Sequence, residues 1–161
     1  MSEIIKVGMA DLKVCTAPDG LTTLGLGSCV GIAMRDPVKG IGGLAHIMLP
    51  DSTIIKDNQN RYKFADTGID DLISQLLALG ANRARLESKI AGGAQMFAFS
   101  SKSSSIQVGA RNVEAVKAKL TALRIPILAE DTGQNFGRTV VYYPENGSFL
   151  IRAVGKDSYT I

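Results

Sequence analysis

Cys29 is the first residue in this sequence whose surroundings suggest chemistry. It follows Gly27 and Ser28 in the stretch LGLGSCVGIAMRDP, residues 24–37, at the point where an apolar run begins. Free cysteine is often a small buried hydrophobic residue, but a thiol at a tight glycine-containing turn can also be a nucleophile. In that case, backbone N–H groups near Gly27 and Ser28 would stabilise the negative oxygen of an attacked acyl group. This second interpretation requires a base close to the sulfur.

His46 is the only histidine in the chain and therefore the natural candidate for that base. Two apolar runs, 30–35 and 41–49, flank the sequence DPVKG and predict an antiparallel hairpin that turns at residues 37–40. The other interpretation of His46 is a hydrogen-bonded core residue in the apolar strand LAHIML. The register of the hairpin helps to distinguish these two interpretations, because it determines whether His46 lies near Cys29.

The length of the hairpin loop decides whether Cys29 and His46 share a face. A two-residue turn places Cys29 directly opposite His46. A four-residue loop pairs His46 with Gly31 and leaves Cys29 diagonally placed on the same face, about 7 Å away in backbone terms. Loops of three or five residues would separate the two side chains. An even loop therefore allows a thiol–imidazole pair, in which ion pairing lowers the pKa of the thiol.

A catalytic imidazole also needs a partner that fixes its orientation. Thr23, on the strand before Cys29, is one candidate, and Thr22, Asp131 and Asn135 remain open. Threonine is also a common strand residue without any chemical role. Asp131, Asn135 and Arg138 suit a solvated or turn-capping role equally well. The sequence alone does not choose among them.

The composition is that of an ordinary globular protein. With 161 residues, 45% hydrophobic and 20% charged, the chain can bury a core, and residues 1–161 are expected to form one domain. The net charge of +3, without a concentrated Lys/Arg stripe, argues against nucleic acid as a partner. There is no apolar run of membrane-spanning length and no signal-peptide core, which predicts a cytoplasmic protein without membrane insertion.

The cysteine and histidine counts limit the chemistry further. One histidine excludes the zinc-site patterns that need two, so neither a metal nor another cofactor is expected. Cys15 and Cys29 are expected to be free thiols, with Cys15 structural. A redox role for the two cysteines is an alternative, although the chain has no C-x-x-C motif.

Hydrophobic periodicity predicts strands at both ends of the chain. The last two form a hairpin from TVVYY and SFLIRA around the turn PENG. The expected strands cover residues 21–26, 30–35, 41–49, 84–91, 125–129, 139–143 and 148–153.

Two helices are expected between these strands. The first begins at a cap, Asp66 or Thr67, ends at Gly80, and buries Ile69, Leu72, Ile73, Leu76 and Leu77. The second has Asn112 as its cap and buries Val113, Val116, Leu120 and Leu123. The serine-rich segment 100–105 is expected to be an exposed loop. The pattern predicts a layered α/β sandwich with mixed or antiparallel sheets and two principal helices in a single domain.

Five segments together resemble the CheD family of chemoreceptor glutamine deamidases, over most of the chain. They are TLGLGSCVGIAMRDP (23–37), GGLAHIMLP (42–50), KIAGGAQMF (89–97), VGARN (108–112) and DTGQNFGRTV (131–140). Gln134 departs from the family pattern, in which a second glycine is expected in this loop. The resemblance implies a layered α/β sandwich.

The resemblance also implies roles for individual residues. Cys29 would be the nucleophile, His46 the base and Thr23 the third member of the site, with Gly27 and Ser28 near the oxyanion. The implied reaction converts receptor glutamines to glutamate and ammonia through a cysteine thioester. The same thioester would allow methyl-ester hydrolysis as a side activity.

Partners follow from the same resemblance. The implied substrate is the cytoplasmic helices of chemoreceptors, and the implied protein partner is a CheC-type chemotaxis phosphatase. An alternative function is therefore a non-catalytic adaptor whose main role is binding that phosphatase.

Overall fold

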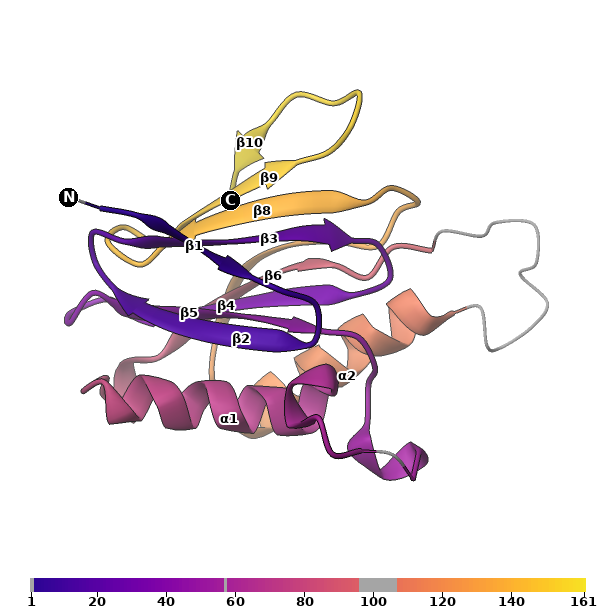
Figure 1. Cartoon of the computed structure of the whole chain (residues 1–161), viewed down its shortest axis with the longest axis horizontal. Helices are drawn as coiled ribbons and strands as arrows, with labels where there is room; N and C mark the ends of the chain where they lie inside the picture. The colour runs from indigo at the N-terminus through magenta and orange to yellow at the C-terminus, as the bar shows by residue number, and fades with distance from the viewer. Residues whose placement is uncertain (1, 57, 96–106) are drawn as a thin grey trace.

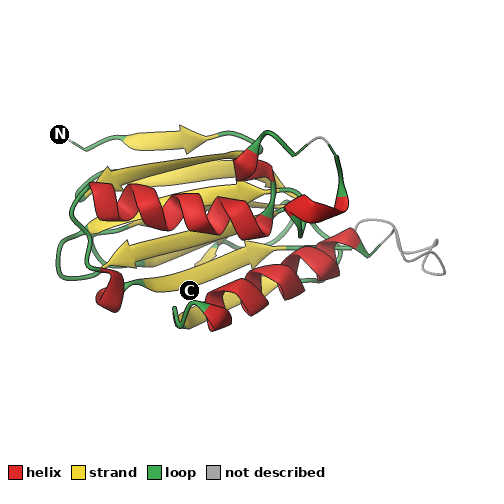
Figure 2. Cartoon of the chain, turned by 90° about the horizontal axis from the view of Figure 1, so that it is seen from below, coloured by secondary structure: helices red, strands yellow, loops and turns green. Residues whose placement is uncertain are grey.

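The fold has three layers, two β-sheets and one layer of helices (Figure 1). The computed structural model describes residues 2–56, 58–95 and 107–161. The outer sheet has the strand order β1-β3-β8-β9-β10 and the central sheet the order β2-β5-β4-β6-β7. Both helices lie along the face of the central sheet that points away from the outer sheet (Figure 2). The predicted layered α/β sandwich is confirmed.

The chain passes between the two sheets four times, at β1–β2, β2–β3, β3–β4 and β7–β8, so residues far apart in sequence meet between them. The outer sheet contains β1 (Ile4–Val7), β3 (Gly20–Leu26), β8 (Arg138–Tyr143), β9 (Ser148–Arg152) and β10 (Tyr159–Thr160). The central sheet contains β2 (Asp11–Thr16), β4 (Val30–Asp36), β5 (Ile41–Ile47), β6 (Glu87–Gly92) and β7 (Ile127–Thr132). The helices are α1 (Ala65–Ala78) and α2 (Val108–Ala122), with short 3-10 turns at Ser52–Ile54, Arg61–Lys63 and Arg83–Arg85.

The central sheet is buried on both faces, and its side chains alternate between two cores. Val30, Ile32 and Met34 of β4 point toward the helices. Ala33 of β4 and Leu44 of β5 pack instead between the two sheets. Side chains on one face of the central sheet therefore contact the helices, and side chains on its other face contact the outer sheet.

The predicted hairpin is confirmed, with the four-residue loop. Asp36 pairs with Ile41, and the ladder continues to Val30 opposite Ile47. The chain leaves β5 at Ile47, earlier than the expected strand, because the N–H groups of Met48 and Leu49 donate to the Lys63 carbonyl, at 2.8 and 3.0 Å. The hairpin made of β8 and β9 is also confirmed.

Several predicted strand limits differ from the structure. The strand expected over 84–91 begins only at Glu87, because Asn82 caps a 3-10 turn through the N–H of Ala84. The strand expected over 125–129 is β7, Ile127–Thr132, which pairs in parallel with β6.

The two predicted helices exist, but their predicted caps are wrong. Phe64 is the N-cap of α1, and Asp66 lies inside the first turn, where it accepts a hydrogen bond from the Ser52 hydroxyl at 2.8 Å. Thr67 also lies inside the helix and donates to the Arg61 carbonyl. Gly80 ends the helix as expected, with φ +110°. Leu77, expected inside, is 41% exposed because it lies at the edge of the apolar stripe.

The second helix begins four residues earlier than its predicted cap. It starts at Val108, and Asn112 is a fully buried residue within it. Gly109 permits this earlier turn to approach the residues that follow β6, since a Cβ there would lie 2.2 Å from the Ala94 carbonyl oxygen. Val116 and Leu120 are buried, and Val113 and Leu123 pack against the same core, as expected. The expected serine-rich loop, 100–105, lies outside the described residues.

No helix within residues 2–56, 58–95 and 107–161 is long and apolar enough to cross a membrane.

Candidate active site

Cys29 lies in a bend between β3 and β4 that β6 and the residues after it hold by backbone hydrogen bonds. The N–H of Gly93 donates to the Cys29 carbonyl and the N–H of Ala94 to the Gly27 carbonyl, both at 2.8 Å. Gly92 comes so close that a Cβ on it would lie 2.2 Å from the Cys29 carbonyl oxygen. The bend is therefore fixed against a second strand rather than free at the surface.

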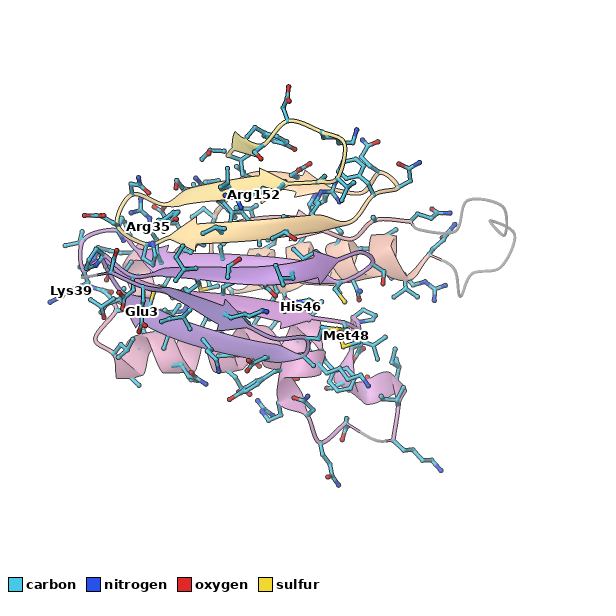
Figure 3. All side chains as sticks on the ribbon, turned by 45° about the horizontal axis from the view of Figure 1, so that its top comes forward. Glu3, Arg35, Lys39, His46, Met48 and Arg152 are labelled. Carbon is cyan, nitrogen blue, oxygen red and sulfur yellow. The ribbon has the colours of Figure 1, made fainter. Side chains whose placement is uncertain are left out.

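His46 lies on the same face of the central sheet as Cys29. It pairs directly with Gly31, so Cys29 occupies the diagonal position predicted for a four-residue loop. Cys29 belongs to the core between the sheets, and His46 contacts the outer sheet through Thr23. Gly31, between them, has no side chain. In Figure 3, His46 lies toward the end of β5 that is remote from Arg35 and Lys39.

Thr23 connects the imidazole to the outer sheet. Its Oγ1 lies 2.8 Å from His46 Nδ1 and 2.8 Å from the Val7 carbonyl oxygen. A hydroxyl has one hydrogen, and a carbonyl can only accept, so that hydrogen goes to Val7. The Thr23 oxygen then accepts from Nδ1–H. This arrangement assigns the hydrogen of neutral His46 to Nδ1 and leaves a lone pair on Nε2.

The free lone pair is visible as an unpaired buried atom. Nε2 of His46 has no hydrogen-bond partner among the described residues. Thr23 and His46 are both completely buried, whereas Cys29 retains 7% exposure. Of the three, Cys29 is therefore the residue that solvent reaches.

Burial favours the neutral form of both the thiol and the imidazole. It lowers the pKa of His46 to about 4 and raises the pKa of Cys29, which the N–H of Cys29 partly opposes. The thiol–imidazole ion pair that the hairpin register allows would lower the pKa of the thiol, and the burial of both groups acts in the opposite direction. At neutral pH the structure favours a neutral thiol beside a neutral imidazole.

The bend also contains backbone donors for an oxyanion. The N–H of Gly27 donates to the Gly25 carbonyl at 3.0 Å. The N–H groups of Ser28 and Cys29 have no protein acceptor within the described part of the chain. The sequence pointed to Gly27 and Ser28 as oxyanion donors. In the described residues, the N–H of Ser28 is available for that role and the N–H of Gly27 is not, and the N–H of Cys29 is available as well.

The remaining candidates from the sequence lie elsewhere. The hydroxyl of Thr22 donates to the Val140 carbonyl within the outer sheet. Arg138 is buried and donates to Asp131 at 3.4 Å and to the Gly133 carbonyl at 3.1 Å, which fixes the loop before β8. Asp131 also accepts from the Tyr159 hydroxyl. The structure assigns no contact with His46 to Thr22, Asp131 or Asn135 in the described residues, so Thr23 is the orienting partner that the geometry provides.

Both cysteines are free thiols, as expected. Cys15 pairs with Gly42 at one end of β5, while Cys29 lies beyond Val30, which pairs with Ile47 at the other end. The two positions on β5, Gly42 and Ile47, are five residues apart, which is about 16 Å along the strand. This separation excludes a disulfide between them without rearrangement. Burial raises the pKa of Cys15 to about 11, which disfavours its thiolate at neutral pH.

A groove of about 440 Å³ lies beside the Cys29 bend. It is lined by Gly93, Gln95, Ala110, Val113, Glu114, Lys117, Thr132, Gly133 and Gln134. It touches the bend through Gly93, and neither Cys29 nor His46 forms part of its described lining. No group of three or more His, Cys, Asp or Glu side chains in residues 2–56, 58–95 and 107–161 is placed to hold a metal ion.

Sequence reasoning missed two residues that shape this site, Gly92 and Asn112. Gly92 lies in a run of small residues that is typical of a turn, and Asn112 resembles a helix cap. The side-chain Nδ2 of Asn112 donates to the carbonyls of Ser28 and Met48, at 2.9 and 3.0 Å. An asparagine inside an apolar helical stripe was the one available signal, because buried polar groups need partners.

A thiol at a backbone bend and an imidazole of fixed tautomer on the same sheet face together form a class of site suited to acyl transfer. Comparison with known proteins gives the family. The model described as CheD chemotactic sensory transduction matches residues 48–153, and this chain belongs to the CheD family.

Curated relatives match nearly the full chain. A "Probable chemoreceptor glutamine deamidase CheD" from Lachnoclostridium phytofermentans is 64% identical and covers 97% of both chains. One with the same name from Caldanaerobacter subterraneus is 55% identical over 96% of this chain and 95% of its own. The "Chemoreceptor glutamine deamidase CheD" of Halalkalibacterium halodurans is 54% identical over 96% of each chain. The family resemblance seen in the sequence is confirmed.

Proposed function

We propose that this protein is a deamidase that converts glutamine side chains of chemoreceptors to glutamate and ammonia. The names of its relatives support the reaction and the substrate. In this proposal Cys29 is the nucleophile, His46 the base and Thr23 the residue that orients the imidazole. The observation that carries the proposal is the hydrogen bond from Nδ1 of His46 to Thr23 Oγ1, whose own hydrogen goes to Val7.

The tautomer matters because a base needs an available lone pair. With the hydrogen on Nδ1, the unpartnered Nε2 can take a proton from a thiol. The raised pKa of Cys29 and the lowered pKa of His46 support a neutral resting pair. The proton therefore moves from Sγ to Nε2 as sulfur attacks, rather than before the substrate binds.

The first half of the reaction forms a thioester. Sulfur bonds to the carboxamide carbon of the substrate, and the carbonyl oxygen takes the electron pair as an oxyanion. The N–H groups of Ser28 and Cys29 stabilise that charge. When the tetrahedral species collapses, the carbon–nitrogen bond breaks and protonated His46 gives its proton to the leaving nitrogen, which departs as ammonia.

The second half restores the enzyme. Neutral His46 takes a proton from water as the water oxygen attacks the thioester carbon. The carbon–sulfur bond then breaks, sulfur regains the proton from His46, and glutamate is released. A methyl ester of glutamate presents the same carbon with methanol as the leaving group. Methylesterase activity through the same thioester therefore belongs to this proposal.

The proposal places the protein in the cytoplasm, where the helices of chemoreceptors that carry the glutamines are found. It also includes a CheC-type phosphatase as a binding partner. Each turnover adds one negative charge to a receptor helix, so repulsion between neighbouring helices changes.

The test is incubation with a cytoplasmic receptor fragment, followed by mass spectrometry. Conversion of one glutamine raises the fragment mass by about 1 Da, and a functional nucleophile makes that gain depend on Cys29. Cys29→Ala is expected to abolish the gain, and Cys15→Ser, the matched control, to leave its rate unchanged.

Two outcomes would contradict the proposal. If wild type and Cys29→Ala give the same absence of conversion while a CheC-type phosphatase still binds, the protein is an adaptor. If Cys15→Ser lowers the rate as much as Cys29→Ala does, the conversion does not depend on Cys29 specifically, which contradicts its proposed role as the nucleophile.

A further inference from the structure

Asn112 occupies an unusual place for an asparagine. It lies inside α2, a helix of 15 residues, and is completely buried. Asparagine is a weak helix former, because its side chain competes for backbone hydrogen bonds. Burial of its amide also costs free energy unless both ends find partners. Asn112 is therefore not expected to stabilise α2 itself.

The contacts of Asn112 reach outside its helix. Nδ2 donates to the Ser28 carbonyl at 2.9 Å and to the Met48 carbonyl at 3.0 Å. Both partners are acceptors, so the amide orientation is fixed and each of its two hydrogens has one partner. Oδ1 is left without a partner among the described residues, as is Nε2 of His46. These are the two buried side-chain atoms of that kind in the described ranges.

The two carbonyls belong to the backbone segments that carry the proposed nucleophile and base. Ser28 directly precedes Cys29, and Met48 follows His46 by two residues. Figure 3 shows His46 and Met48 toward the same end of β5. One amide group from α2 thus joins the two halves of the site.

The hydrogen bonds of Asn112 lie just beyond the last ladder pair of β4 and β5. The hydrogen-bonded pairing of β4 with β5 ends at Val30 and Ile47. Beyond that pair the two chains separate, since the Met48 N–H donates to Lys63 and the Cys29 carbonyl accepts from Gly93. Beyond the last ladder pair, the Asn112 amide connects the two segments by its hydrogen bonds to the Ser28 and Met48 carbonyls.

The same contact orients a proposed oxyanion donor. In a trans peptide the C=O and the following N–H point in opposite directions. Because the Ser28 carbonyl is turned toward α2, the N–H of Cys29 points away from it. The contact therefore holds that donor on the side of the peptide opposite to Asn112.

We propose that Asn112 is a positioning residue that sets the separation of the Cys29 thiol and the His46 imidazole by joining their backbone segments. The inference rests on the proposed use of these two residues. It predicts that the effect of His46 on Cys29 depends on Asn112, whichever substrate the enzyme acts on.

A double-mutant cycle tests this dependence without a receptor substrate. The measurement is the rate at which iodoacetamide alkylates Cys29, with mass spectrometry separating Cys29 from Cys15. In the wild-type background His46→Gln should slow alkylation by about tenfold or more, because the base that removes the thiol proton is lost. In the Asn112→Leu background the same change should alter the rate less than about twofold. Leucine keeps the size of the side chain and removes both donors.

Val116→Ala provides the matched control. Val116 is buried one turn further along the same face of α2 and has no polar contact. In that background the effect of His46→Gln should equal the wild-type effect. If the effect of His46→Gln is as large with Asn112→Leu as without it, or absent in the wild-type background, the inference is overturned.

Asn112→Asp keeps the test decisive if Asn112→Leu does not fold. The carboxyl has the same shape, donates one hydrogen bond when protonated and none when ionised. Burial between two carbonyls raises its pKa, so the coupling should weaken further as pH rises from 5 to 8. A pH-independent coupling equal to that of the control contradicts the inference.

Deamidation measured in parallel separates this inference from the proposed function. Asn112→Leu should lower kcat by about tenfold or more and change KM less than about twofold, because the residue touches no substrate. If wild-type protein does not convert glutamine but the cycle shows the expected coupling, the proposed function fails and the role of Asn112 stands.

Discussion

At the scale of single residues, one hydrogen atom decides what His46 can do. The Thr23 hydroxyl donates to the Val7 carbonyl, so it can only accept from Nδ1–H of the imidazole. Threonine thereby does what a carboxylate does in a serine-protease triad, where an acceptor fixes the tautomer. Unlike a carboxylate, it adds no negative charge, so nothing raises the imidazole pKa against the effect of burial.

Replacing Thr23 with valine should therefore disable His46, the proposed base. Valine keeps the shape of threonine but removes the acceptor for Nδ1–H and leaves the Val7 carbonyl unpaired. We expect kcat for deamidation to fall about 10²- to 10³-fold, since the wrong tautomer becomes accessible. Thr23→Ser retains the hydroxyl and should keep kcat within about tenfold of wild type. Equal activity of the two variants would show that the hydroxyl does not orient His46.

The burial of His46 also predicts the pH dependence of the rate. Its pKa of about 4 leaves His46, the proposed base, neutral throughout the mildly acidic range. We expect kcat/KM, corrected for folded protein, to change less than about twofold between pH 7.5 and pH 5.5. A base with the ordinary histidine pKa would lose about tenfold over that interval. Such a loss would contradict the neutral resting pair.

At the scale of elements, the bend that carries Cys29 depends on the end of β6. Gly92 has φ +111°, and the N–H of Gly93 donates to the Cys29 carbonyl. Cys29, the proposed nucleophile, is therefore positioned by a segment some sixty residues later in the chain, through backbone contacts that any side chain on Gly92 would disturb.

Gly92→Ala should displace Cys29. The added Cβ would lie 2.2 Å from the Cys29 carbonyl oxygen, and the backbone conformation at φ +111° is strained for alanine. We expect loss of more than about 90% of deamidase activity and a lower free energy of unfolding, by about 2 kcal/mol. Gly25→Ala is a useful control, since that glycine also has a positive φ but no atom lies within 4 Å of the added Cβ. If both variants retain the same activity, the contact with Gly92 does not position the thiol.

The hairpin of β4 and β5 shows how far local patterns reach. The alternation of apolar residues and the turn DPVKG predicted the hairpin but left its loop length open between two and five residues, and the structure has the four-residue loop. That register alone placed Cys29 and His46 on one face. The helical periodicity likewise found α1 and α2, but not the residues at which they begin.

Two other positions show features of the structure that local sequence patterns do not predict. Asn112 resembles a helix cap in the sequence, because its real partners, Ser28 and Met48, are more than sixty residues away. Gln134 has φ +62°, the conformation for which a glycine was expected from the family pattern. The loop thus keeps the glycine-like geometry with a different residue, which no propensity rule would predict.

At the scale of the whole molecule, the candidate active site forms because the outer sheet packs face to face against the central sheet. Thr23 comes from the outer sheet and His46 from the central one, and their contact lies in the core between them. The sequence predicted layered sheets but not which strand belongs to which sheet. The choice of Thr23 over Thr22, Asp131 and Asn135 needed that pairing, because adjacent residues of one strand face opposite sides.

The buried imidazole should make the stability of the whole fold depend on pH. In the unfolded chain His46 has a pKa near 6.5, and in the folded protein burial lowers that pKa to about 4. Between these values the unfolded state binds more protons, so the free energy of unfolding rises with pH. The contribution is fully present above pH 6.5 and is lost as pH falls toward 4.

Urea denaturation at pH 5 and pH 7 measures this effect. Wild type should lose about 2 kcal/mol of unfolding free energy between pH 7 and pH 5. His46→Gln removes the only histidine in the chain, so over the same interval its free energy of unfolding should change by less than about 0.5 kcal/mol. The pKa of Asp36 is held far below its usual range by Arg85, and its effect appears only at lower pH in both proteins. Identical pH dependence in the two proteins would mean that His46 is protonated as easily in the fold as in water, and a base held neutral by burial would then have no support.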